Sequence, residues 1–139
     1  MCEYAIQICS LAKREKVTIE DVYQFIMRSP STFQQVGSSE FKENSPCFAM
    51  LRQAEANLKG ATEARRYKQA ATFFLAEALQ LGDKARGAAI SQVSAVLSPF
   101  LQSPLYETVC CEESDFSPLM AISGKCVAMD FPVMTLGDG

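Results

Sequence analysis

The stretch from Thr62 to Leu81, TEARRYKQAATFFLAEALQL, carries the clearest helical pattern in the chain. Its apolar residues recur every three or four positions and form one stripe: Tyr67, Ala70, Ala71, Phe74, Leu75, Ala78 and Leu81. This spacing puts them on one face of an α-helix, so the stretch predicts a helix that packs that face against a core. Gly82 follows and ends the predicted helix, because glycine adopts the backbone conformation that closes helices.

Helical patterns also precede this stretch. Residues 2–12 show apolar side chains at helical spacing, and the basic run KREK at residues 13–16 ends that helix in a solvated turn. Thr18 and Asp21 fit a capping box that begins a second helix, which Pro30 stops. Residues 29–45 predict a loop with one or two short helical turns. Pro46 then begins a third helix, which Gly60 ends.

Two more helices are predicted after Gly82. Asp83 can cap a helix that ends or kinks at Pro99, and a short helix runs from Pro104 to about Val109. Gly87 and several serines make the first of these helices slim, which favours close packing against a neighbour.

Composition excludes several classes of protein. A hydrophobic fraction of 48% in 139 residues predicts a folded domain with a core rather than a disordered chain. The net charge of -3 argues against nucleic-acid binding by the whole surface, although a local basic patch stays open. The chain contains no histidine, which excludes Ser/His and Cys/His nucleophiles and every metal site that needs histidine.

The cysteine spacing, the apolar runs and the N-terminal residues bear on metal binding and on location. None of the six cysteines forms a C-x-x-C pair, so we expect structural thiols and no metal site. The longest uncharged apolar run falls short of the roughly 20 residues of a spanning helix, so we expect no membrane insertion. The N-terminus, Met1-Cys2-Glu3, lacks the basic residues of a signal peptide, and a cytoplasmic location follows as an expectation.

The pattern changes towards the C-terminus. The stretch from Gly124 to Val133, GKCVAMDFPV, resembles a buried strand that leaves a turn. No second strand is predicted to pair with it, and a single strand is not stable alone. It either pairs with another copy or belongs to a sheet outside this chain. We favour the second interpretation, in which the chain is a piece of a larger α/β protein.

Five segments in this order resemble the helical domain of type IV secretion coupling ATPases, the TraG/TraD-like proteins of conjugation. They are VTIEDVYQFI at residues 17–26, PCF at 46–48 with LRQA at 51–54, GDKAR at 82–86, SPFLQSPL at 98–105, and GKCVAMDFPV at 124–133. The last two segments, at this separation, are the most specific part of the resemblance.

The resemblance implies a RecA-like nucleotide-binding domain into which a helical domain is inserted. Such ATPases form hexamers at the cytoplasmic side of the bacterial inner membrane, and the insertion helps to select a relaxase-DNA complex or an effector protein. Residues 1–110 would then be the helical substrate-recognition domain, 111–124 a linker, and 125–139 the strand and turn that return to the core. The fold class expected is mainly α, with about six or seven helices followed by one strand of a missing α/β core.

The phosphate-binding loop of the family, G-x-x-x-x-G-K-[ST], is not present in this chain. Gly124-Lys125 has no glycine five residues earlier, and Cys126 stands where the magnesium-binding hydroxyl belongs. Asp130 ends the predicted strand but is followed by Phe131-Pro132 rather than a second carboxylate. We therefore expect no enzyme activity, no catalytic residue and no cofactor here. ATP and Mg²⁺ would belong to the parent protein, by resemblance.

The substrate-binding candidates are basic. The cluster Arg65-Arg66-Tyr67-Lys68 lies mostly off the apolar stripe, and Lys84 and Arg86 add two charges across the Gly82 turn. Arginine and lysine bind phosphates or acidic protein segments, so the expected partners are a relaxase or another secreted protein, or DNA, beside the other subunits of a hexamer. The alternative is a solvated helix face, whose charge Glu63 and Glu77 offset.

A second reading of the whole chain stays open. In it the chain is a free-standing cytosolic α-helical adaptor that binds partner proteins through a helix groove.

Overall fold

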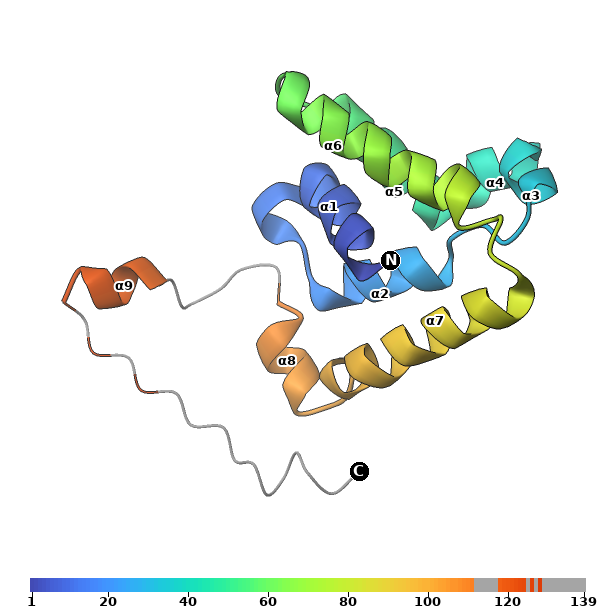
Figure 1. Cartoon of the computed structure of the whole chain (residues 1–139). Coiled ribbons are helices and arrows are strands. Elements are labelled where there is room, and N and C mark those ends of the chain that lie inside the picture. Colours follow the sequence, from blue (N-terminus) through green and yellow to red (C-terminus); the bar gives the residue numbers. More distant parts are fainter. Residues whose placement is uncertain (112–117, 125, 127, 129–139) are drawn as a thin grey trace.

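A computed structural model describes residues 1–111, 118–124, 126 and 128 (Figure 1). Within these residues the regular structure is helical throughout, which confirms the mainly α fold. The elements in chain order are α1 (Cys2–Lys13), η1 (Arg14–Lys16), α2 (Ile19–Met27), α3 (Phe33–Gly37), α4 (Ser39–Asn44), α5 (Pro46–Ala56), α6 (Ala61–Thr72), η2 (Phe73–Glu77), α7 (Asp83–Leu97), η3 (Ser98–Leu101), α8 (Leu105–Val109) and α9 (Pro118–Ile122). The strand predicted at 125–133 lies outside the described residues, apart from Cys126 and Ala128.

Helix α1 forms the centre of the core. It packs against α5, α6 and α2, and Figure 1 shows α5 and α6 side by side along one side of it. Ala5, Ala12, Ala54 and Ala70 are buried where these helices meet, and such small side chains let helices approach closely. Larger side chains fill the remaining space: Ile8, Leu11, Val22, Phe25, Ile26, Phe41, Leu51 and Phe74.

Helices α2 to α5 begin with side-chain caps, whereas the cap predicted at Asp83 is wrong, because Gly82 is the N-cap of α7 and no side chain caps this helix. The capping box predicted at Thr18 is confirmed, because its Oγ1 accepts from the Asp21 amide at 3.2 Å and Asp21 Oδ2 accepts from the Thr18 amide at 2.9 Å. Thr32, Ser38 and Ser45 cap α3, α4 and α5 in the same way, each accepting from the amide three residues on. The segment 29–45 therefore holds two short helices, as predicted.

The helix predicted over 62–81 is interrupted. Helix α6 gives way to the π turn η2, in which the Ala78 amide donates to the Phe73 carbonyl at 2.7 Å. The helical stretch ends at Glu77, so the prediction that it runs to Leu81 and is ended by Gly82 is wrong. Leu81 lies beyond the helix and is 42% exposed, and Gly82 is instead the N-cap of α7. The prediction that Gly60 ends the third helix is also wrong, because α5 stops at Ala56 and Gly60, with φ 91°, precedes α6.

Helix α7 is attached to the core through α2. Arg86 is the one buried residue of α7, and its Nη2 donates to the Ser29 carbonyl at 3.0 Å and to Ser29 Oγ at 3.1 Å. Burial lowers the pKa of this guanidinium. Next to this helix, Tyr106 of α8 donates to Glu20 of α2 at 2.6 Å. Figure 1 shows α7 on the side of α2 that faces away from α5 and α6.

Candidate functional site

An apolar groove runs between α5 and α6 and continues along η2. Its volume is about 500 Å³, and its lining includes Leu58 together with Tyr67, Ala71 and Leu75 of the apolar stripe. Leu58, Tyr67 and Leu75 pack against the core on one side and are only partly buried. Desolvation, assisted by Glu55, raises the pKa of the Tyr67 phenol. Part of the predicted stripe thus lines a surface groove, which we call the α5–α6 groove.

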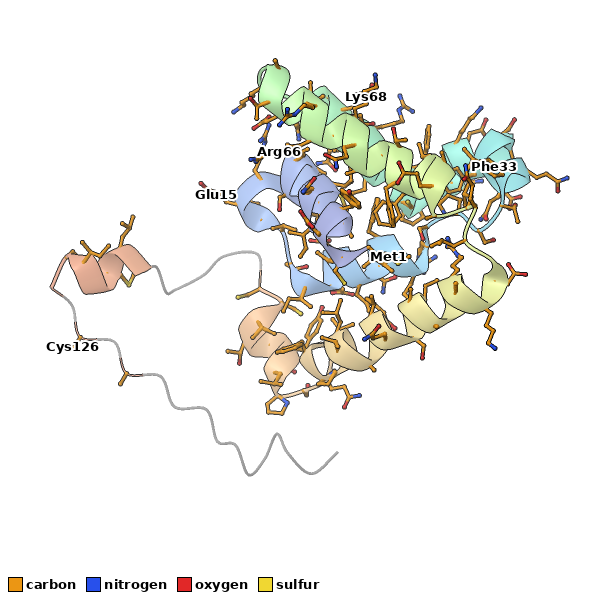
Figure 2. All side chains as sticks on the ribbon, viewed as in Figure 1. Met1, Glu15, Phe33, Arg66, Lys68 and Cys126 are labelled. Atoms are coloured by element: carbon orange, nitrogen blue, oxygen red, sulfur yellow. The ribbon has the colours of Figure 1, made fainter. Side chains whose placement is uncertain are left out.

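One basic side chain, Lys68, lies in the lining of this groove, together with the carboxylate of Glu55. Arg65 and Arg66 are exposed on the same helix but do not line the groove, and Arg66, two residues before Lys68, lies on the opposite face of α6. Figure 2 shows Arg66 and Lys68 both projecting from α6. No salt bridge joins these three residues to a carboxylate in the described part of the chain. Of the two carboxylates expected to offset this charge, Glu63 is paired with Arg14.

Lys84 and Arg86 do not extend this surface. Lys84 is exposed in the first turn of α7, and Arg86 is buried against Ser29. Figure 1 places α7 and α6 on opposite sides of the α1–α2 pair. The five basic residues singled out in the sequence therefore separate into a group of three on α6, one exposed lysine on α7, and one structural arginine.

A second basic surface combines residues far apart in the sequence. Lys59, in the turn between α5 and α6, lies at the same hollow of about 580 Å³ as Lys13, Arg14 and Lys16. We call this hollow the basic corner. The KREK run was interpreted only as a solvated turn, and Lys59 carries no sequence signal of its own. The packing of α5 and α6 against α1 brings these residues together.

The basic corner is held by an ion pair. Arg14 Nη1 lies 2.8 Å from Glu63 Oε1 and Arg14 Nη2 lies 3.0 Å from Glu63 Oε2, which is the bidentate geometry of a strong pair. Arg14 also donates to the carbonyl of Asn57, whose side-chain amide donates to the Ala12 carbonyl at 2.7 Å. Arg14 adopts φ 58°, a conformation that residues other than glycine seldom adopt, and these bonds hold it there.

The Arg14–Glu63 pair predicts an acid-sensitive contribution to stability. Hydrogen bonds from Arg14 and from the Lys59 amide lower the pKa of Glu63 from 4.5 to about 2. The stabilisation is therefore fully present above pH 4.5 and is lost as the pH falls through about 2. We expect Glu63→Gln to lower the melting temperature at neutral pH and to make the remaining stability less sensitive to acid over this range.

Thermal unfolding followed by circular dichroism across that pH range tests this prediction. Glu43→Gln, which removes an exposed carboxylate of α4, is the matched control and should keep the wild-type profile. An acid profile of Glu63→Gln identical to that of the wild type would contradict the assignment.

Two cysteines belong to the core. Cys9 and Cys47 are completely buried, and desolvation raises the pKa of each thiol to about 12. Both are therefore neutral at physiological pH, which makes them poor nucleophiles.

The described residues contain no cluster of three or more cysteine or carboxylate groups that could hold a metal ion. Across the same part of the chain, no helix has the length and apolar character to cross a membrane.

Fold and site together define an α-helical domain with a mainly apolar surface groove whose charged lining residues are Lys68 and Glu55. No family model matches the chain, and no match was found among curated proteins or solved structures.

Proposed function

We propose that this chain is a protein-recognition module that binds an amphipathic helical segment of a partner in the α5–α6 groove. The observation that carries the proposal is the groove itself, in which Leu58, Tyr67 and Leu75 stay partly exposed between two helices. An amphipathic helix buries its apolar face in such a groove through residues at positions i, i+3, i+4 and i+7. The cations of α6 favour a partner whose polar face is acidic.

A protein partner explains the groove better than a nucleic acid does. Proteins that bind single strands stack the bases on exposed aromatic side chains beside a positive groove. Among the lining residues the one aromatic side chain is Tyr67, and it is partly buried against the core. The aliphatic lining instead suits leucine-like side chains, and the net charge of -3 does not favour a polyanion in general.

The wider setting that we propose is substrate recognition in a type IV secretion coupling protein. The support is the sequence resemblance, and the groove would then receive a helix of a relaxase or effector protein. In the alternative setting, a free-standing adaptor, the same groove serves a different partner. The reading frame separates the two: a coupling ATPase requires G-x-x-x-x-G-K-[ST] upstream of Met1, whereas an adaptor predicts a native chain near 139 residues.

A charged side chain in the groove should abolish binding. The probe is a fluorescein-labelled amphipathic peptide of about 16 residues, with leucines on one face and glutamates on the other. Leu75→Asp puts a carboxylate where the leucines dock, so we expect at least about a tenfold rise in Kd by fluorescence anisotropy. Leu81→Asp, at an exposed leucine outside the groove, is the control and should leave the Kd unchanged. Equal affinities for the two variants would overturn the proposal.

Charge reversal on α6 should weaken binding without affecting folding. Arg65, Arg66 and Lys68 are exposed, so changing all three to glutamate should leave the chain folded. We expect the affinity for the glutamate-bearing peptide to fall, and the difference from the wild type to shrink as salt screens the charges. Reversing Arg28, Lys42 and Lys84, three exposed cations outside α6, is the control with the same change in net charge. A loss of equal size in the control would show that only net charge matters.

A further inference from the structure

The α5–α6 groove and the basic corner are neighbouring hollows that a third hollow links, and we call the three together the depression. A smaller hollow of about 290 Å³ lies between them, and it shares Leu58 with the groove. At its other side it shares Arg14 and Lys59 with the basic corner. The depression therefore runs along α6, around the turn between α5 and α6, and ends at η1. One end is mainly apolar, with Lys68 and Glu55 as its charged lining residues, and the other is lined by four cationic side chains.

Two of the four cations are available to a ligand. Arg14 is bound to Glu63, and Lys13 forms a 2.8 Å ion pair with Asp21. Lys16 and Lys59 are exposed, and no salt bridge engages either ammonium group in the described part of the chain. Glu15 is the one acidic residue in the lining, so the formal charge of the lining is positive.

Hydrogen bonds and an ion pair within the chain fix the shape of the basic corner without a ligand. The bidentate Arg14–Glu63 pair fixes η1 to the start of α6, and the Asn57 side chain fixes the turn to the end of α1. The Lys59 amide donates to Glu63 Oε2 at 2.7 Å, which holds the backbone that carries this lysine. A site whose framework is already ordered loses less conformational entropy on binding.

We infer that the helical partner segment carries an acidic cluster at one end, which binds in the basic corner while its apolar face occupies the groove. This inference rests on the proposed function and adds to it the direction in which the partner helix lies in the depression. Carboxylates of the acidic end would pair with the Lys16 and Lys59 ammonium groups, and leucine-like side chains would contact Leu58, Tyr67 and Leu75. Four cationic side chains line the basic corner, whereas the groove lining has one cation, Lys68, beside one carboxylate, Glu55. This difference between the two ends would fix the direction in which the partner lies.

Four labelled peptides test the inference by fluorescence anisotropy at constant ionic strength. All share one amphipathic leucine-bearing core with a neutral polar face. The first peptide has about four glutamates before the core, and the second has them after it. The third has glutamines at both ends. The fourth has glutamates before the core, like the first, but serines replace the core leucines. They are titrated into the wild type, the Lys16→Gln/Lys59→Gln variant, and the matched control Lys42→Gln/Lys84→Gln.

We expect one of the two glutamate peptides to bind about tenfold more tightly than the other and than the glutamine peptide. This preference should disappear in Lys16→Gln/Lys59→Gln and persist in the control. Equal binding of the first three peptides, abolished by Leu75→Asp, would overturn the inference and leave the proposed function standing. Binding that ignores the core leucines, or no binding by any peptide, would overturn both.

Discussion

Replacing Phe74 with alanine is expected to lower the free energy of unfolding by about 3–5 kcal/mol, the range for large-to-small changes at buried aromatic positions. Phe74 is completely buried within the π turn. Its ring lies 4.9 Å from that of Phe25 and 5.2 Å from that of Phe73, with interplanar angles of 89° in both cases. Edge-to-face contacts of this kind add to the energy of apolar burial, and the cavity left by alanine has rigid helices around it.

Urea denaturation monitored by circular dichroism measures this loss directly. The matched control is Phe33→Ala, because Phe33 is 56% exposed on α3 (Figure 2) and should change stability by no more than about 0.5 kcal/mol. If the two variants lost similar amounts, Phe74 would not belong to the core and the position of η2 would be wrong.

The second large effect is expected at Ile8, in the middle of α1. Ile8 is completely buried in the helix that contacts α2, α5 and α6, so Ile8→Ala should destabilise the chain by about 2–5 kcal/mol. Ile6, two residues earlier, is 50% exposed, and Ile6→Ala is a control with the same chemistry in the same helix. We expect the control to retain most of the wild-type stability. Equal losses would mean that α1 presents a different face to the core.

Local sequence signals predicted most of the helices. The Thr18 capping box, Pro46 in a first helical turn and the stop at Pro30 act within a few residues, so they can be recognised without the tertiary structure. The π turn at Phe73–Glu77 could not be recognised in this way. Its apolar residues continue the helical spacing of α6, so nothing in the sequence marks the extra residue of the π turn or the end of the helix at Glu77.

The candidate site was predictable only in part. Arg65, Arg66 and Lys68 were singled out because they lie off an apolar stripe, and the structure places Lys68 in the groove lining and leaves the two arginines exposed outside it. Arg86 was singled out for the same reason as the two arginines of α6, namely its charge. It is nevertheless buried, and it donates hydrogen bonds to the carbonyl and the hydroxyl of Ser29.

The basic corner shows a different difficulty. It joins Lys59 to residues 13–16, and a contact over this sequence distance depends on how α5 and α6 fold back along α1. The groove likewise exists because two helices leave Tyr67 and Leu75 incompletely covered, which depends on the packing of the whole domain and not on either helix alone.

Amide chemical-shift mapping tests the central claim most directly. The isotopically labelled chain is titrated with the amphipathic leucine-glutamate peptide, and the position of every shifted amide is recorded. We expect the largest changes in α6, η2 and the Asn57–Gly60 turn, with little change in α7. Changes concentrated in α7 or α3, or no change when peptide is in large excess, would contradict the assignment of the α5–α6 groove as the binding site.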